Sequence, residues 1–246
     1  MKMFRLLRLD HIVIDTGNLQ QSLDFYAKLP GFKISVEKGR GVAGIGQQKI
    51  NIHQYPPVLT PAALHPMIGH QSFGLEYPGT PEQFQEYFLP LQVGAPAASQ
   101  SGFFINDPDG NQIEIGFDRT SPRPLPRIQY LTLLAADMEA SLRFYAETLG
   151  MEVMQSKNGI LCGLVTGYIR IVAEGSGLTR GTGDFCLITD ADIEAAQREL
   201  AGAPFVSNLG IVMRHGALGP MKSMYLRDPD GNLVELAEYI EKKITS

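Results

Sequence analysis

Two glutamates and one histidine supply side-chain types that bind metals. Glu114 and Glu235 each follow an Asp-Pro-Asp-Gly tetrapeptide, and His11 lies in the apolar stretch LDHIVID near the N-terminus. A carboxylate whose strand neighbours face a core is costly to bury unless it is paired or bound to a metal. A neutral imidazole with one or two carboxylates is a normal site for zinc, nickel, manganese or iron. The alternatives are two glutamates exposed on a half-buried sheet and a hydrogen-bonded structural histidine.

A turn and an alternating strand position each glutamate, in DPDGNQIEIGF from Asp107 and in DPDGNLVELAE from Asp228. Proline at the second position fixes φ, and glycine at the fourth position accepts φ > 0. The apolar and polar residues that follow alternate, which predicts a strand with one face on the core. The pattern leaves open which surface each glutamate contacts.

The chain is an internal duplication. RLDHIVIDTGNLQQSLDFYAKLPGF, from Arg8, aligns without a gap to RIQYLTLLAADMEASLRFYAETLGM, from Arg127, at an offset of 119 residues, and the two Asp-Pro-Asp-Gly turns lie 121 residues apart. Two motifs in the same order at the same spacing indicate a true repeat. We therefore predict one domain over residues 1–118, a Pro-rich linker over 119–126 and a second domain over 127–246.

Helix and strand patterns alternate within each half. A strand in LDHIVID precedes a helix in NLQQSLDFYAKL, with Asn18 as its cap, and Asp137 is expected to cap the matching helix of the second half. Strands follow around GVAGIG and KINIHQY, and later segments repeat the order with helices in TPEQFQEYFLPL and ADIEAAQREL. Each half therefore contains two successive β-α-β-β-β units.

These residues resemble the vicinal oxygen chelate superfamily, which includes glyoxalases, extradiol dioxygenases and bleomycin- or fosfomycin-resistance proteins. The similarity is carried by Asp10-His11, SLDFYAKLPGF, SLRFYAETLGM, QKINIH and both Asp-Pro-Asp-Gly strands, and it extends over about residues 8–239. The resemblance implies an α+β fold in which four βαβββ units form two tandem glyoxalase-like domains with curved, cup-shaped mixed sheets. One such scaffold hosts many reactions, so the resemblance predicts the fold more firmly than the reaction.

The resemblance also implies a divalent metal (Zn, Ni, Mn or Fe) held inside a cup by residues on the first and last strands of paired units. If the units are exchanged between halves, one cup collects His11, Asn51, Asp184 and Glu235, and the other collects Tyr130, Arg170, Ser72 and Glu114. If each half forms its own cup, the first holds His11, His70 or Ser72, and Glu114, and the second holds Tyr130, Asp184 and Glu235. We favour the exchanged arrangement, because one cup then keeps every good ligand while Arg170 neutralises Glu114 in the other.

The predicted metal ligands are accordingly His11, Asp184 and Glu235, with Glu235 also catalytic, and the alternative ligand set is His11, His70 and Glu114. Predicted substrate contacts are Asn51, His53, Arg214 and His215, the last two because the segment MRHGALGP could meet an anionic substrate. Two departures from the family pattern matter. Tyr130 stands where a ring-cleaving dioxygenase would have a histidine, and Asn51 stands where a glyoxalase would have a glutamate.

The resemblance favours a metal-dependent enzyme that acts on a small molecule with vicinal oxygens. The reaction would be a lyase or isomerase proton transfer, or an oxygenation if the metal is iron. The alternative is a metal-free binding or drug-resistance protein that uses the same cup.

Composition limits the partners. The net charge of −5 provides no basic surface for nucleic acid, and no apolar run is long enough to span a membrane. Arg8 and Asp10 interrupt the apolar N-terminal stretch, and no cleavage pattern follows it. We expect a cytoplasmic monomer or homodimer whose partner is a small-molecule substrate.

Overall fold

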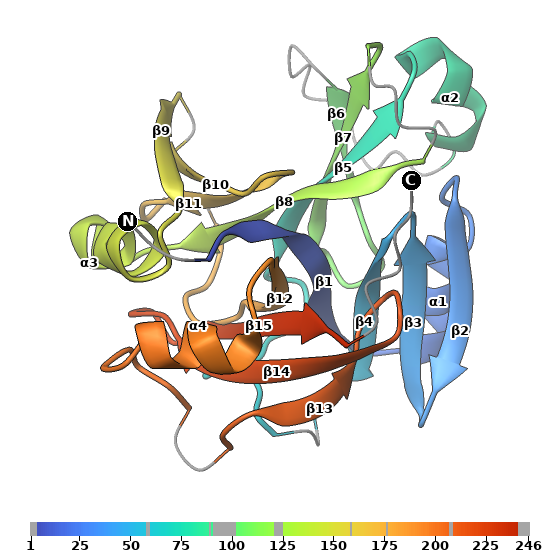
Figure 1. The fold of residues 1–246 in the computed structure, drawn as a ribbon. Coiled ribbons are helices and arrows are strands. Elements are labelled where there is room, and N and C mark those ends of the chain that lie inside the picture. Colours follow the sequence, from blue (N-terminus) through green and yellow to red (C-terminus); the bar gives the residue numbers. More distant parts are fainter. Residues whose placement is uncertain are drawn as a thin grey trace.

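A computed structural model shows a mixed α+β fold of two curved sheets (Figure 1). The structure describes residues 4–57, 60–88, 90, 102–120, 125–157, 159–175, 177–206 and 209–240. Residues 121–124 of the predicted linker lie outside these ranges. None of the helices in the described ranges has the length and apolar character needed to cross a bilayer.

Four units of strands and helices follow one another along the chain. The first comprises β1 (Leu6–Thr16), α1 (Leu19–Tyr26), β2 (Phe32–Glu37), β3 (Arg40–Ile45) and β4 (Gln48–Gln54). The second comprises β5 (Ser72–Pro78), α2 (Pro81–Phe88), β6 (Gly102–Asn106) and β7 (Gln112–Asp118), with residues 91–101 outside the described part. The third comprises β8 (Arg127–Leu134), α3 (Met138–Leu142) continued by a π-helix (Arg143–Thr148), β9 (Glu152–Ser156), β10 (Gly159–Gly163) and β11 (Tyr168–Val172). The fourth comprises β12 (Asp184–Thr189), α4 (Ile193–Glu199), β13 (Val212–His215), β14 (Pro220–Arg227) and β15 (Leu233–Tyr239).

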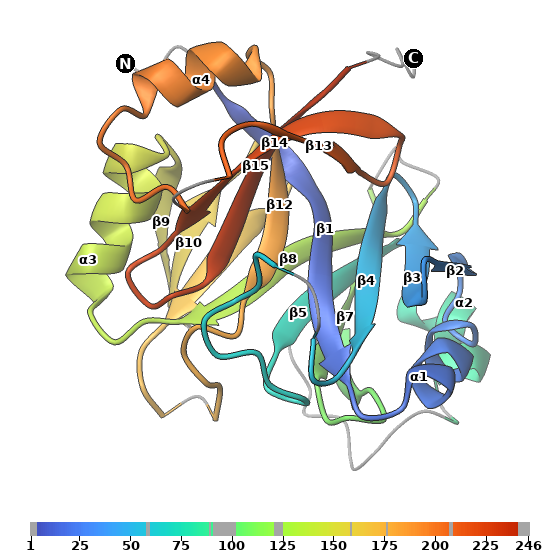
Figure 2. The same cartoon turned by 90° about the horizontal axis from the view of Figure 1, so that it is seen from below.

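Each sheet combines one unit from each half of the chain. Sheet A has the order β13-β14-β15-β12-β1-β4-β3-β2, so the first unit pairs with the fourth. Sheet B has the order β6-β7-β5-β8-β11-β10-β9, so the second unit pairs with the third. Figure 2 shows β1 flanked by β12 on one side and β4 on the other. The units are therefore exchanged between the halves, as favoured above, whereas the domain boundaries 1–118 and 127–246 stay a prediction.

The Asp-Pro-Asp-Gly turns join the two sheets, which explains why the chain contains them twice. In the first half, Asp107 accepts a hydrogen bond from the Tyr26 hydroxyl at 3.0 Å, and Asp109 accepts one from the Ser22 hydroxyl at 3.1 Å. These aspartates precede β7 in sheet B, whereas Tyr26 and Ser22 lie on α1, which packs on sheet A.

The second half repeats the arrangement with the sheets reversed. The Tyr145 hydroxyl donates to Asp228 at 2.8 Å, and the Ser141 hydroxyl donates to Asp230 at 3.2 Å. Because Tyr26 and Tyr145 are both buried, these aspartates satisfy hydroxyls that would otherwise be costly to bury.

Both predicted helix caps are confirmed. The Asn18 side chain accepts from the amide of Gln21, and the Asp137 side chain accepts from the amides of Glu139 and Ala140. Each cap satisfies amides that have no partner inside the helix. Each cap therefore fixes the residue at which its helix begins.

Candidate active site

Three neighbouring strands of sheet A place a histidine and a glutamate on either side of a cysteine. His11 on β1 is paired with Cys186 on β12, and Cys186 is paired with Glu235 on β15. Residues paired across strands point to the same face of a sheet, and adjacent strands lie about 4.8 Å apart. The long side chains of His11 and Glu235 therefore meet above the small Cys186, with His11 Nε2 3.5 Å from Glu235 Oε2.

The His11 imidazole is buried between two carboxylates. Its Nδ1 lies 3.0 Å from Asp10 Oδ2, and its Nε2 faces Glu235. Burial alone would lower the pKa of His11, but the hydrogen bonds and negative charges of Asp10 and Glu235 raise it to about 9. Burial would likewise raise the pKa of Asp10, yet His11, Arg8 and Tyr239 hold it at about 2.

Asp10 also binds the tip of the β13–β14 hairpin. Its Oδ2 accepts the Ala217 amide at 2.9 Å, and its Oδ1 accepts the Tyr239 hydroxyl. Tyr239 in turn accepts the Leu218 amide at 3.1 Å, and Lys49 donates to the carbonyl of His215 at 2.8 Å. The carboxylate that orients His11 therefore also fixes the hairpin beside it. A register irregularity in β1 between Leu9 and His11 accompanies this arrangement.

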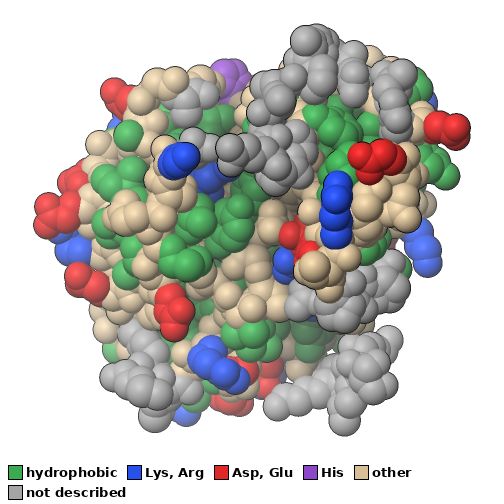
Figure 3. Space-filling model, turned by 90° about the horizontal axis from the view of Figure 1, so that it is seen from above, with side chains coloured by type: hydrophobic (Ala, Val, Ile, Leu, Met, Phe, Trp, Pro, Cys, Tyr) green, Lys and Arg blue, Asp and Glu red, His purple; other side chains and the backbone are tan. Residues whose placement is uncertain are grey.

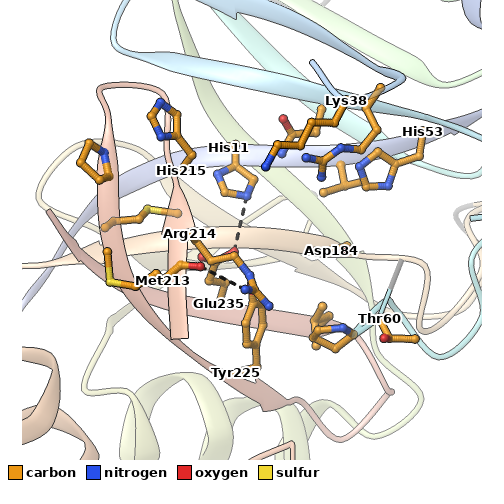
Figure 4. Close-up of a pocket in the computed structure, with 17 residues that line it drawn as sticks. His11, Lys38, His53, Thr60, Asp184, Met213, Arg214, His215, Tyr225 and Glu235 are labelled. Atoms are coloured by element: carbon orange, nitrogen blue, oxygen red, sulfur yellow. Dashed lines mark hydrogen bonds and ion pairs between the residues drawn. The ribbon is translucent and has the colours of Figure 1, made fainter. Parts of the chain in front are cut away.

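A cavity of about 650 Å³ opens over this part of sheet A (Figure 4). It is lined by all seven residues of the favoured ligand and substrate sets: His11, Asn51, His53, Asp184, Arg214, His215 and Glu235. Thr60 and Pro61 also line it, so the Pro-rich segment after β4 forms part of its wall. The exchange of units thus brings these residues together, and their individual roles stay predictions.

Asp184 and His53 line the same cavity, and burial favours the neutral form of both. Burial raises the pKa of Asp184 to about 7; the charge of His11 opposes this rise, and those of Glu235 and Asp15 add to it. Burial lowers the pKa of His53 to about 4, and the positive charges of Arg40 and His11 act in the same direction. His53 is therefore neutral near pH 7. Its Nε2 has no hydrogen-bond partner among the described residues.

The alternative ligand set His11, His70 and Glu114 is not brought together. Glu114 lies on β7 of sheet B, where Arg170 approaches its Oε2 at 3.5 Å and the Tyr130 hydroxyl donates to the same oxygen. His70 Nδ1 instead contacts the Thr179 hydroxyl at 2.9 Å. Glu114, Tyr130 and Arg170 therefore contact one another in sheet B, and Arg170 also lies over the Tyr130 ring, 4.1 Å from its centroid.

Sequence reasoning missed several residues of the site. Asp10 and Cys186 form with His11 a buried group whose potential ligand atoms all lie within 4.8 Å of one another, and Asp184 is not part of that group. Lys38 and Arg40 line the cavity from the β2–β3 hairpin. The Asp-His dipeptide was a usable signal for Asp10. No local pattern marks Lys38, Arg40 or Cys186, because their place depends on which strands become neighbours.

A model of the Glyoxalase/Bleomycin resistance protein/Dioxygenase superfamily matches residues 8–87 and 127–236, most of both halves. The chain belongs to this superfamily. The superfamily and the fold class that the sequence predicts are both confirmed.

Three relatives illustrate the match within the glyoxalase superfamily. Virulence protein STM3117 of Salmonella typhimurium is 33% identical over 124 residues, which are 47% of this chain and 86% of that protein. A putative dioxygenase from Bacillus subtilis has a TM-score of 0.67 at 15% identity, covering 96% of this chain and 86% of its own. Glyoxalase I from Zea mays has a TM-score of 0.61 at 18% identity, covering 96% and 92%. The two structural matches show a shared fold.

The residues present fit the divalent metal that the glyoxalase superfamily implies. Glu235 Oε1 is buried and has no hydrogen-bond partner among the described residues, and it lies beside the His11 imidazole. A buried carboxylate oxygen without a partner is costly, and a cation would remove that cost. An imidazole with two carboxylates is also a donor set common to zinc, nickel, manganese and iron sites.

Proposed function

We propose that the protein is a metal-dependent enzyme that transforms a small molecule with two adjacent oxygens, by proton transfer of the lyase or isomerase kind. His11, Asp184 and Glu235 would hold the metal, which would polarise the two oxygens when bound. The observation that supports this most strongly is the buried, unpartnered Oε1 of Glu235 beside His11 at the floor of the cavity.

The chain's own residues would carry the remaining tasks. Glu235 is also proposed as the base, because a carboxylate that lines the cavity can take a proton from carbon beside a carbonyl. Asp10 holds the His11 imidazole in one orientation through Nδ1, so that Nε2 faces the cavity. Asn51 and neutral His53 would hydrogen-bond the substrate. With iron as the metal, the same cavity would suit oxygenation.

A metal-free binding protein is the second candidate. One observation favours it: neither Asp184 nor Glu235 belongs to the group of Asp10, His11 and Cys186 whose ligand atoms all lie within 4.8 Å of one another. In this case His11 would remain paired with Asp10 and Glu235, and the cavity would bind its ligand without chemistry. The cup is complete within one chain, so either function is compatible with a monomer or a homodimer.

Metal content per chain distinguishes the two functions. We expect about one equivalent of zinc, nickel, manganese or iron in the untagged protein after reconstitution, reduced strongly in His11→Ala and Glu235→Gln. Glu114→Gln is the matched control, because Glu114 occupies the corresponding position of sheet B and is paired with Arg170. Absence of metal from the parent protein would reject the enzyme, and loss in Glu114→Gln alone would move the site to sheet B.

A further inference from the structure

Cationic side chains face the candidate site from opposite edges of sheet A. Arg40 begins β3 and Lys38 lies in the β2–β3 turn, whereas Arg214 lies on β13 at the other edge of the sheet. All three line the same cavity, and Figure 4 shows Lys38 and Arg214 on either side of it, with His11 nearby. The β2–β3 hairpin and β13, which are far apart in sequence, therefore place positive charges around the same cavity.

None of these three cations forms an ion pair with the described residues, and Arg214 is held in place by a tyrosine. Arg214 Nε donates to the Tyr225 hydroxyl at 2.8 Å, and its guanidinium lies 5.4 Å from the centroid of the Tyr225 ring. For Arg40 and Lys38, no carboxylate partner is found among the described residues. Charged groups without partners beside a cavity are available to a ligand.

The turn that carries Lys38 has an unusual backbone. Lys38 has φ of 53° and Gly39 has φ of 79°, the pair of positive values that a type I′ hairpin requires. Lys38 is the single non-glycine residue with positive φ in the described ranges, although asparagine or glycine would fit better there. The turn thus keeps a long cationic side chain at the mouth of the cavity at some backbone cost.

The charge balance of the cavity favours an anion. Besides His11, which is paired with Asp10 and Glu235, its lining has three cationic side chains, Lys38, Arg40 and Arg214, and two carboxylates, Asp184 and Glu235. A divalent cation would neutralise both carboxylates and leave the three positive charges in a concave, partly buried space where electrostatic attraction is strong. This local excess contrasts with the net charge of −5 of the whole chain.

We propose that the substrate is a small organic anion, with a carboxylate, phosphonate or phosphate group bound between Arg40 and Arg214 and its two adjacent oxygens directed to His11 and Glu235. The placement of the two adjacent oxygens at His11 and Glu235 rests on the proposed function. The cavity volume of about 650 Å³ is typical of sites for small molecules, and it limits the size of the substrate. Arg40 and Arg214 would then determine specificity, since a neutral analogue would leave their charges unpaired.

A matched pair of chelators tests the proposal on the metal-reconstituted protein. Butyrohydroxamate and succinate monohydroxamate share a hydroxamate head and chain length, but only the second carries a remote carboxylate. By calorimetry we expect succinate monohydroxamate to bind at least about tenfold more tightly, and Arg40→Gln or Arg214→Gln to remove most of that ratio. Arg40→Lys should restore part of it. The control is Arg143→Gln, an exposed arginine paired with Glu139 on the helix surface.

The outcomes separate this inference from the proposed function. If the parent protein holds metal and binds both hydroxamates equally, the anion site is rejected while the metal-dependent enzyme stands. If the protein holds no metal, inorganic phosphate is titrated instead. Phosphate binding that Arg40→Gln and Arg214→Gln abolish would support the anion site and reject the enzyme. No phosphate binding would reject both.

Discussion

Each nitrogen of the His11 imidazole faces a different carboxylate. Nδ1 is bound to Asp10, and Nε2 is directed toward Glu235 and the cavity. A carboxylate on one nitrogen fixes the ring orientation and makes the other nitrogen a stronger ligand. We therefore propose Asp10 as a positioning residue, and its contacts with Ala217 and Tyr239 also hold the adjacent hairpin.

Removing the charge of Asp10 should weaken metal binding without removing a ligand. We expect Asp10→Asn to lower metal affinity by about 10- to 100-fold, measured by competition with a chelating dye. Asp24→Asn is the control, because Asp24 lies on the exposed side of α1 and accepts from Gln20. Unchanged affinity in Asp10→Asn, with affinity lost in His11→Ala, would show that Asp10 has no positioning role.

The neutral state of His53 can be observed directly. Burial and the nearby positive charges of Arg40 and His11 lower its pKa to about 4. Because the folded protein resists this protonation, stability should be full above the unfolded pKa of about 6.5 and fall as the pH drops from there toward 4. NMR titration of the metal-free protein should show one imidazole that titrates near pH 4 and is absent from His53→Gln. A titration of that resonance near 6.5 would contradict the prediction.

At the scale of elements, the first helical segment of each half is tied to an Asp-Pro-Asp-Gly turn that leads into the other sheet. The Tyr26–Asp107 and Tyr145–Asp228 hydrogen bonds join corresponding residues of the two halves, at 3.0 and 2.8 Å. The motif therefore has a structural function beyond its turn: it satisfies a buried tyrosine hydroxyl and closes the contact between sheets. The glutamate that follows it faces the cavity in one half and an arginine in the other.

Loss of either tyrosine hydroxyl should destabilise the fold by a similar amount. Tyr26→Phe and Tyr145→Phe each remove one hydrogen bond to a buried aspartate, which costs about 1–3 kcal/mol in the free energy of unfolding. Urea denaturation measures this. Tyr87→Phe should have little effect, because Tyr87 is exposed. A cost for only one of the two tyrosines would mean that the repeated contact is not equivalent in the two halves.

The ion pair between Arg170 and Glu114 should contribute to the stability of sheet B. Arg170→Met would leave Glu114 mostly buried without its partner, at an expected cost of about 2–4 kcal/mol. Glu114→Gln in the same chain should recover part of the loss, since the unpaired charge is then gone. Thermal and urea unfolding give both values. Metal content should stay constant, because the proposed metal site lies in sheet A; a loss of metal would argue against that proposal.

At the scale of the whole molecule, neither sheet can form from one half of the chain. β1 pairs with β12 and β5 pairs with β8, so a separated half would expose both of these strand edges. Unpaired strand edges favour association. Hydrophobic side chains are also exposed on the face seen in Figure 3, and the edge strand β9 exposes Val153 and Met154.

The halves should therefore depend on each other. Residues 1–120 and 125–246, produced together as separate chains, should copurify as a one-to-one complex with the metal content of the intact protein. Either half alone should be aggregated or self-associated, as measured by light scattering after gel filtration. A stable, folded monomer from one half would contradict the exchange of units.

The sequence by itself determined the duplication, the caps at Asn18 and Asp137, the turns and alternating strands around both glutamates, and the superfamily. These depend on local physical chemistry: φ preferences of proline and glycine, capping of free amides, and the period of side chains along a strand. Such preferences act between residues close in sequence, so they can be read without knowing the partners.

Only the tertiary structure decided which unit completes which cup. β5 and β12 have corresponding positions in the duplication, and local patterns do not distinguish them as partners for β1. Packing over the whole chain makes that choice, and it places Asp184 and Glu235, not His70 and Glu114, in the cavity with His11. The same choice brings Arg40 opposite Arg214. Residues that meet through long-range strand pairing cannot be recognised from their neighbours in sequence.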